Sequence, residues 1–154
     1  MPNRIVSERK RTGARSGATQ FRVLVTEDNI ALRQLMADVL EYEGYCVTEA
    51  ANAFEMQSAI LQSGSERASN TPFDLIVSDV SMPGKSGLEA LSELRQSGLR
   101  SRFLVVTSFP EVVTYHQIEK LDVSLLEKPF SLKEFRTMAT AMLKLPIPDS
   151  ASTP

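Results

Sequence analysis

The 154-residue sequence predicts an α/β fold, in which a five-stranded parallel sheet carries helices on both faces. Two observations lead to this prediction. Short apolar runs alternate five times with longer segments of helical periodicity, as in strands joined by right-handed crossovers. Four of the five runs also end in polar groups that can do chemistry, and the carboxyl ends of parallel strands share one edge of the sheet.

The first strand is predicted at Val23–Val25 and is followed by a helix. Asn29 is a favourable N-cap for that helix, and Gly44 ends it. Two adjacent acids, Glu27 and Asp28, stand between strand and helix, and their repulsion requires a compensating cation or metal. The apolar residues of the helix recur at helical spacing: Leu32, Leu35, Met36, Val39 and Leu40.

The second strand is predicted at Tyr45–Thr48 and the second helix at Phe54–Leu61. Cys46 is interpreted as a small buried residue, because no neighbouring base or cation is evident that would activate its thiol. A polar connection, Ser63–Pro72, is expected on the surface. The inner face of the second helix is expected to carry Met56, Ala59 and Ile60.

The apolar run Leu75–Val77 has the length and β-branched content of a buried strand, and it ends at a lone carboxylate, Asp79. Glycine and proline then break the chain into a loop at Pro83, Gly84 and Gly87. A third helix follows and ends at Gly98. Its apolar residues are Leu88, Leu91 and Leu94.

The fourth strand is predicted at Phe103–Val106, ending in Thr107, and a fourth helix from Pro110 to about Lys120. This helix carries Val112, Tyr115 and Ile118. The only histidine, His116, is expected on its surface, where it and Tyr115 could belong to a partner-binding face, although Tyr115 could instead pack.

The fifth strand is predicted at Leu125–Leu126 and ends in Glu127–Phe130, which includes Lys128. Ser131 and Glu134 form a capping box for the last helix. The inner face of this helix is expected to hold Phe135, Met138, Ala139 and Met142.

Composition limits the class of protein. The hydrophobic content of 42% and charged content of 23% are ordinary for a soluble domain, and no apolar run approaches the ~20 residues of a membrane span. No secretory signal is visible, and a single cysteine rules out a disulfide framework and a cysteine-based zinc site. These features favour the cytoplasm and no membrane partner.

Charge separates a basic arm from an acidic domain. Residues 1–22 hold six basic residues and one acid, so 11 of the 17 basic and 18 of the 19 acidic residues remain in 23–154, a net charge of −7. Residues 1–20 are predicted to be a disordered, solvated arm, 21–145 the folded domain, and 146–154 a short disordered tail. Nucleic-acid contact is unlikely and possible only through the arm, because no DNA-reading motif is visible.

The polar strand ends predict phosphoryl chemistry. Clustered carboxylates suit Mg²⁺, with Asp28 and Asp79 as direct ligands and a backbone carbonyl near Ser81 as a third. Lys128 and Thr107 could bind oxygens of a phosphoryl group, and Asp79 could itself be the nucleophile that forms an aspartyl-phosphate. Each residue alone has an ordinary structural explanation, such as a turn cap or a surface ion pair. Their convergence at one edge is what favours a site.

These motifs together resemble a response-regulator receiver domain of two-component signalling, of the stand-alone type. The resemblance covers roughly residues 21–145 and rests on Val23–Asn29 (VLVTEDN), Asp74–Glu89 (DLIVSDVSMPGKSGLE), Val105–Ser108 (VVTS) and Glu127–Phe130 (EKPF). It implies a flavodoxin-like, doubly wound sheet with strand order 2-1-3-4-5. It also implies a cis peptide bond between Lys128 and Pro129.

The resemblance also implies functional roles. Asp79 would accept a phosphoryl group from a sensor histidine kinase or a histidine phosphotransfer protein, with Mg²⁺ held by Glu27, Asp28, Asp79 and the carbonyl of Ser81. Thr107 and Lys128 would contact the phosphoryl group. The domain would be mainly a switch, with weak self-catalysed phosphorylation and dephosphorylation. Its downstream protein target would bind the face of the fourth helix, fifth strand and fifth helix.

Three features depart from the family pattern. Leu125 stands where an aromatic switch residue is usual, Ser108 stands where a smaller residue is common, and the connection before Phe73 is longer than usual. The departure at Leu125 puts the usual coupling of Thr107 to a rotating aromatic ring in question.

Other functions remain open. The main alternative is a protein-interaction module with a receiver fold that acts independently of phosphorylation. A metal-dependent phosphatase is disfavoured, because such enzymes commonly carry a second aspartate two positions after the nucleophile, where this chain has Ser81. Dinucleotide binding is disfavoured because no glycine-rich turn follows the first strand.

Overall fold

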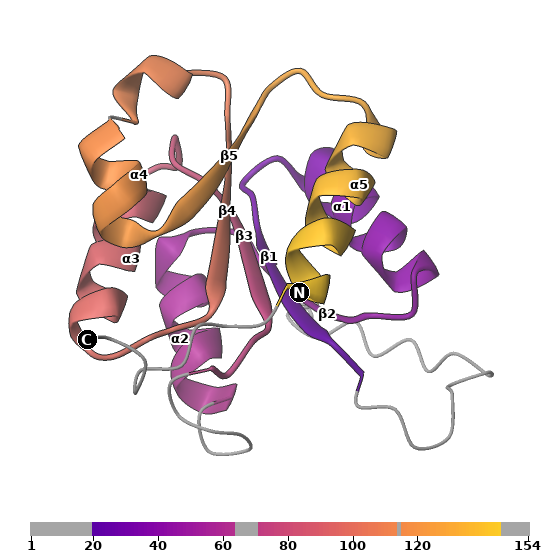
Figure 1. The fold of residues 1–154 in the computed structure, drawn as a ribbon, viewed down its shortest axis with the longest axis horizontal. Coiled ribbons are helices and arrows are strands. Elements are labelled where there is room, and N and C mark those ends of the chain that lie inside the picture. Colours follow the sequence, from indigo (N-terminus) through magenta and orange to yellow (C-terminus); the bar gives the residue numbers. More distant parts are fainter. Residues whose placement is uncertain (1–19, 64–70, 114, 146–154) are drawn as a thin grey trace.

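The computed structural model describes residues 20–63, 71–113 and 115–145. Within these ranges the predicted α/β class and strand order are confirmed, because five parallel strands form one sheet in the order β2-β1-β3-β4-β5 (Figure 1). The strands are β1 (Arg22–Thr26), β2 (Cys46–Ala50), β3 (Leu75–Asp79), β4 (Arg102–Thr107) and β5 (Val123–Glu127).

Helices cover both faces of the sheet (Figure 1): α1 and α5 lie on one face, and α2, α3 and α4 lie on the other. Each face buries its own apolar cluster, and the residues of β3 are buried throughout. This two-sided burial explains why the strands read as continuous apolar runs. The helices are α1 (Ile30–Tyr42), α2 (Ala53–Ser63), α3 (Gly87–Gln96), α4 (Tyr115–Leu121) and α5 (Leu132–Lys144).

Local sequence chemistry sets the helix ends as predicted. The side chain of Asn29 accepts a hydrogen bond from the Leu32 N–H, and Ser131 accepts one from the Glu134 N–H. Beyond the ends of α1 and α3, the chain adopts a left-handed conformation at Gly44 (φ 95°) and Gly98 (φ 101°), which favours glycine. The N-caps start α1 and α5 directly beside the loops that carry the candidate site.

The prediction of one helix from Pro110 to about Lys120 was wrong in its extent. A short 3₁₀ helix spans Pro110–Val112, and α4 begins only at Tyr115. Between them the backbone of Val113 is extended (φ −98°, ψ 107°) and its side chain is buried in the cluster under α2, α3 and α4. Burial of Val113 therefore overrides helical periodicity. His116 is exposed as predicted, and Tyr115 is 88% exposed, so it does not pack into the core.

Cys46 was predicted to be buried, but it is half-buried. The difference follows from its place at the start of β2, which lies at the edge of the sheet. This strand also extends past the predicted end to include Glu49 and Ala50. Residues 1–19 of the predicted arm (1–20), residues 64–70 of the predicted connection and the predicted tail, 146–154, lie outside the described residues. The connection was expected on the surface, but Ser63 and Pro72 at its two ends are buried.

Candidate functional site

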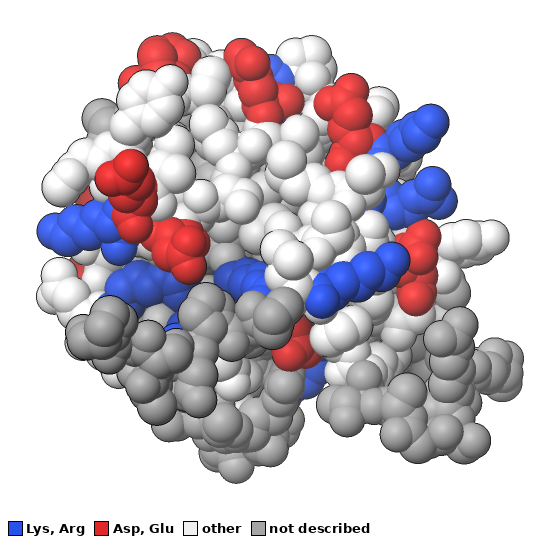
Figure 2. Space-filling model, viewed as in Figure 1, with Lys and Arg blue, Asp and Glu red and all other residues white. Residues whose placement is uncertain are grey.

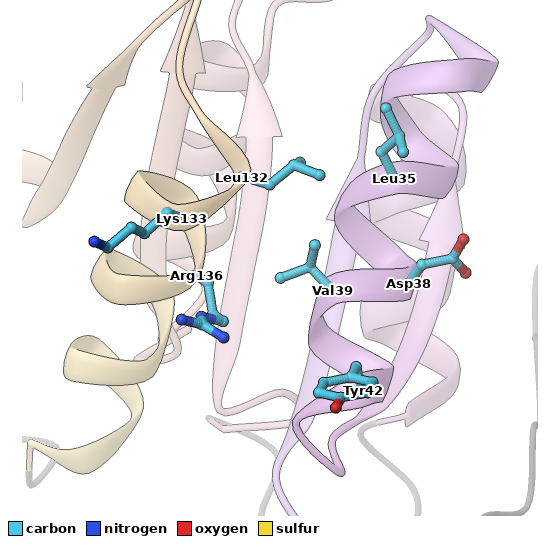
Figure 3. A pocket seen from close by; sticks show the side chains of 7 residues that line it. All are labelled: Leu35, Asp38, Val39, Tyr42, Leu132, Lys133 and Arg136. Atoms are coloured by element: carbon cyan, nitrogen blue, oxygen red, sulfur yellow. The ribbon is translucent and has the colours of Figure 1, made fainter.

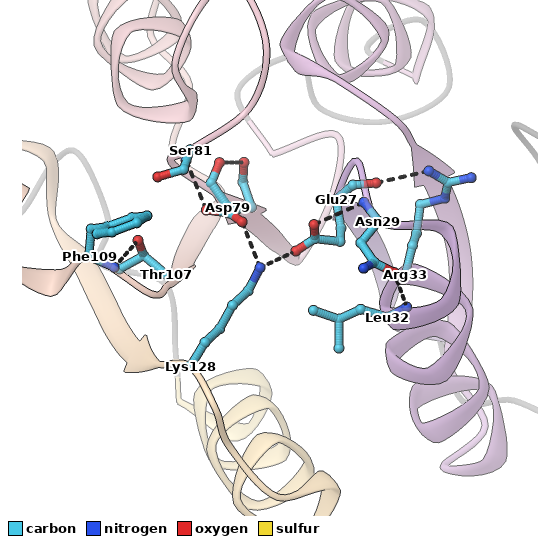
Figure 4. Close-up of polar contacts among 10 residues, drawn as sticks. Glu27, Asn29, Leu32, Arg33, Asp79, Ser81, Thr107, Phe109 and Lys128 are labelled. Carbon is cyan, nitrogen blue, oxygen red and sulfur yellow. Dashed lines mark hydrogen bonds and ion pairs between the residues drawn. The ribbon is translucent and has the colours of Figure 1, made fainter.

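Three carboxylates meet at the carboxyl edge of the sheet. Glu27 and Asp28 follow β1, and Asp79 ends β3. Figure 4 shows Glu27 and Asp79 both joined to Lys128. One oxygen from each of the three carboxylates lies within 4.8 Å of the others. Glu27 and Asp79 are buried, whereas Asp28 is exposed. The parallel pairing of β1 with β3 accounts for the cluster, because it brings these two strand ends side by side.

Lys128 reaches this cluster from the loop after β5. Its Nζ donates hydrogen bonds to Glu27 Oε1 and to Asp79 Oδ2, each at 2.6 Å. The backbone N–H of Lys128 donates to the carbonyl oxygen of Thr107 at 2.8 Å, and the peptide bond to Pro129 is cis, as predicted. The lysine thus places one positive charge between two buried carboxylates.

Burial and charge act in opposite directions on the ionisation of this pair. Burial raises the pKa of Glu27 above its ordinary value, and the hydrogen bond from Lys128 offsets only part of this effect. Burial alone would lower the pKa of Lys128, but its hydrogen bonds to Asp79 and Glu27 outweigh that effect and raise the pKa. Lys128 therefore carries its charge at neutral pH.

The Asp79 carboxylate is held from its own loop as well. Its Oδ1 accepts a hydrogen bond from the Ser81 N–H at 2.8 Å. Gly87, the first residue of α3, packs against the strand end so closely that an added Cβ would lie 2.6 Å from the Asp79 carbonyl oxygen and 2.8 Å from Ser78 Oγ. A glycine at this position lets α3 begin next to Asp79.

Thr107 ends β4 and is fully buried. Its Oγ1 accepts a hydrogen bond from the Phe109 N–H at 3.0 Å, which connects the strand end to the loop that follows (Figure 4). Leu125, the residue at the usual aromatic position, pairs with Val105 across β4 and β5. It is half-buried and packs on the cluster under α2, α3 and α4.

Glu27 is held at each of its polar groups. Its N–H donates to the Ala50 carbonyl at 3.1 Å, and its Oε2 accepts from the Asn29 N–H at 3.1 Å. Lys128 binds Oε1, and the Arg33 Nη1 donates to the Glu27 carbonyl oxygen at 2.8 Å. The acid is therefore fixed by β2, α1 and the loop after β5.

Sequence reasoning missed Arg33 and its partner Glu49. Arg33 Nε lies 3.2 Å from Glu49 Oε1, with 16% and 11% of the two side chains exposed. The available signal was a basic residue in α1 and an acidic residue in β2. The predicted second strand, however, stopped short of Glu49. A buried charge within an element is typically paired, and each residue points to the other.

The donor set suits a hard divalent cation. It offers carboxylate oxygens from three residues, which Mg²⁺ prefers to nitrogen or sulfur ligands. Asp28 leaves one side of the cluster open to solvent, where water ligands would be needed. Lys128 neutralises only part of the negative charge of the three acids. These residues therefore fit Mg²⁺.

The surface also carries a groove that is lined by none of the three clustered acids. This groove of about 450 Å³ runs between α1 and α5 (Figure 3). Apolar side chains form most of its lining, with charged groups at its margins: Leu35, Asp38, Val39, Tyr42, Leu132, Lys133 and Arg136. In the described part of the chain, no helix has the length and apolar character needed to cross a membrane.

Comparisons with known proteins agree with the fold. Residues 23–140 match the family model of the response regulator receiver domain. The chain is 38% identical over 111 residues to the transcriptional regulatory protein FixJ of Azorhizobium caulinodans, covering 70% of this chain and 48% of that protein. It is 33% identical over 123 residues to the sensor kinase CckA of Brucella abortus, covering 79% of this chain and 12% of the kinase. The chain thus spans about half or less of these curated relatives.

Solved structures give the same result. The receiver domain of the hybrid histidine kinase CckA superposes with a TM-score of 0.62 at 27% identity, covering 80% of this chain and 99% of that one. The chemotaxis response regulator CheY4 of Vibrio cholerae superposes with a TM-score of 0.65 at 28% identity, with the same coverage. Together with the family model, these matches show that the chain belongs to the response regulator receiver domain family of two-component signalling.

Proposed function

We propose that this receiver domain is a phosphoacceptor switch. Asp79 takes a phosphoryl group from a phosphohistidine on a sensor histidine kinase or a histidine phosphotransfer protein. The observation that carries the proposal is the position of the Asp79 carboxylate, which ends a central strand beside two further acids and a lysine ammonium group at 2.6 Å. Carboxylates so arranged supply a nucleophile, a metal site and a counter-charge in one place.

The metal would be Mg²⁺, held by Glu27, Asp28, Asp79 and the carbonyl of Ser81. Once bound, it supplies positive charge that offsets the charge of the transferring phosphoryl group. A response regulator of similar fold, TrrA of Thermotoga maritima, has been crystallised in complex with Mg²⁺-BeF. The three clustered acids of this chain support an equivalent site.

In the transfer step, a carboxylate oxygen of Asp79 forms a bond to phosphorus while the phosphorus–nitrogen bond to the donor histidine breaks. The histidine nitrogen leaves with the electron pair of that bond, so no oxidant or reductant is needed. Lys128 moves from the carboxylates to a phosphoryl oxygen, and the Thr107 hydroxyl donates to another. Hydrolysis of the aspartyl-phosphate by water resets the domain with weak self-catalysis.

The output is a population shift toward a conformation that the phosphoryl group stabilises. The hydrogen bond between Thr107 and the Phe109 N–H supports this proposal, because it joins the site to the loop that leads to α4. The downstream protein target binds the face made by α4, β5 and α5. Tyr115, the exposed first residue of α4, offers such a partner a large apolar contact.

We also propose that the protein acts in the cytoplasm and that nucleic acid takes no part in its core function. On the face shown in Figure 2, blue Lys and Arg side chains lie beside red Asp and Glu side chains. Mixed charge of this kind does not favour broad binding to a phosphate backbone.

Intact mass after incubation with acetyl phosphate tests the proposal. The wild-type chain is expected to gain the mass of one HPO₃ group with Mg²⁺ present and none with excess chelator. Asp79→Asn is expected to gain nothing. Asp74→Asn is the matched control, because Asp74 precedes the amino end of the same strand and accepts a hydrogen bond from the Arg22 N–H.

A wild-type chain that gains no mass with either acetyl phosphate or a phosphorylated histidine donor would contradict the switch. The interaction module that acts independently of phosphorylation would then be the better explanation. Uptake by Asp79→Asn would instead show that another residue is the acceptor.

A further inference from the structure

Arg33 joins three parts of the fold at one edge of the site. It lies in the first turn of α1. Its guanidinium contacts the loop after β1, as Figure 4 shows, and also the strand β2. Nη1 donates to the Glu27 carbonyl oxygen at 2.8 Å, and Nε donates to Glu49 Oε1 at 3.2 Å. The side chain of Arg33 is 16% exposed and that of Glu49 is 11% exposed. A flat guanidinium holding two acceptors at once fixes both of them in direction.

The Glu27 carbonyl belongs to the peptide unit that joins Glu27 to Asp28. Because a peptide unit is planar, a hydrogen bond at its oxygen fixes the direction in which the chain continues to Asp28. Asp28 is exposed, so packing does little to set its position. The contact from Arg33 therefore constrains the one acid of the cluster that burial leaves free.

We infer that Arg33, with Glu49 as its charge partner, is a positioning residue for divalent-cation binding by Glu27, Asp28 and Asp79. The inference rests on the proposed function, because it concerns the metal of that site. Mg²⁺ requires near-octahedral geometry with oxygen ligands at about 2.0–2.1 Å, so a small displacement of one carboxylate weakens binding. Residues that orient metal ligands without touching the metal typically change metal affinity by about 10–100-fold.

Glu49 offsets the positive charge that Arg33 brings close to the proposed metal site. An uncompensated guanidinium beside the three acids would repel a divalent ion. The Glu49 carboxylate neutralises that charge through Nε, while Nη1 keeps its hydrogen bond to the Glu27 carbonyl oxygen. Arg33 therefore supplies orientation with little electrostatic opposition to the ion.

The test is the Mg²⁺ dissociation constant of the full chain, measured by calorimetric titration and by the NMR shift of the Ser81 amide. In the double variant Arg33→Met, Glu49→Leu, both charges are removed together, so neither stays buried and unpaired. Its dissociation constant is expected to rise about tenfold, while its urea midpoint stays close to that of the wild type. Arg33→Lys is expected to fall between them, because a single ammonium group cannot hold both acceptors.

Arg95 provides a matched control at the opposite end of the sheet. Its guanidinium is also half-buried, and it donates to the carbonyls of Leu99, Ser101 and Leu121 at 2.8–3.0 Å. Arg95→Met is expected to lower the urea midpoint and to leave Mg²⁺ binding unchanged. Equal Mg²⁺ affinity in the double variant and the wild type would overturn the positioning role alone. A wild type that binds no Mg²⁺ would overturn the proposed metal site, and this inference with it.

Discussion

Lys128 Nζ lies 2.6 Å from Asp79 Oδ2, although 49 positions separate the two residues in the sequence. The lysine comes from the loop after β5 and the aspartate from the end of β3, with β4 between these strands. The same ammonium group lies 2.6 Å from Glu27 Oε1. This shared cation is the feature on which the first prediction depends.

Lys128→Gln is expected to separate metal binding from phosphoryl uptake. Removal of a positive charge from the acids should tighten Mg²⁺ binding. It should also slow phosphorylation by acetyl phosphate about 10²-fold, since a donor to the transferring group is lost. Calorimetry and a mass-based time course measure the two effects, with Lys133→Gln on α5 as control. A variant that is slower and also binds Mg²⁺ more weakly would contradict this electrostatic account.

Thr107→Val is expected to uncouple phosphorylation from the loop after β4. The substitution keeps the shape of the buried side chain but removes the hydroxyl that accepts from the Phe109 N–H. With beryllofluoride and Mg²⁺, the backbone amide NMR signals of Ser108, Phe109 and residues 111–113 should shift in the wild type and in Thr107→Ser. They should shift little in Thr107→Val. Full shifts in the valine variant would show that the loop responds without this hydroxyl.

Gly87→Ala is expected to damage both stability and the site. The added Cβ would lie 2.6 Å from the Asp79 carbonyl oxygen, so β3 and α3 must move apart. Overpacking of this kind costs about 1–3 kcal/mol in the free energy of unfolding, which urea titration measures. Mg²⁺ affinity should fall as well. Gly98→Ala should be destabilising through its φ of 101°, yet should keep wild-type Mg²⁺ affinity.

Phe135→Ala is expected to detach α5 from the sheet. Phe135 is fully buried, and its ring stacks on that of Phe130 with centroids 5.8 Å apart. Loss of a buried aromatic ring costs about 3–5 kcal/mol in the free energy of unfolding, measurable by urea titration. Leu132→Ala, at a side chain 40% exposed on the same helix, should cost much less. A loss for Phe135→Ala as small as that for Leu132→Ala would show that the Phe135 ring contributes little to the packing of α5.

The sequence predicted most of the fold because its signals are local. Asn29 and Ser131 cap the helices that follow them, and Gly44 and Gly98 take the left-handed conformation beyond helix ends. Such signals act over a few residues and do not depend on distant partners. The break at Val113 escaped prediction because Val113 is buried in the apolar cluster on the face covered by α2, α3 and α4, which periodicity does not encode.

The sequence by itself determined which chemical groups stand at the strand ends: Glu27, Asp28, Asp79, Thr107 and Lys128. Tertiary structure alone decided their mutual geometry, because strand order and register set which ends are neighbours. It decided that Lys128 lies between Glu27 and Asp79, and that Arg33 binds both Glu49 and the Glu27 carbonyl. Lys128 is 101 positions from Glu27 and 49 from Asp79, and Arg33 is 16 from Glu49. Only packing of the sheet against its helices brings such groups within hydrogen-bond distance.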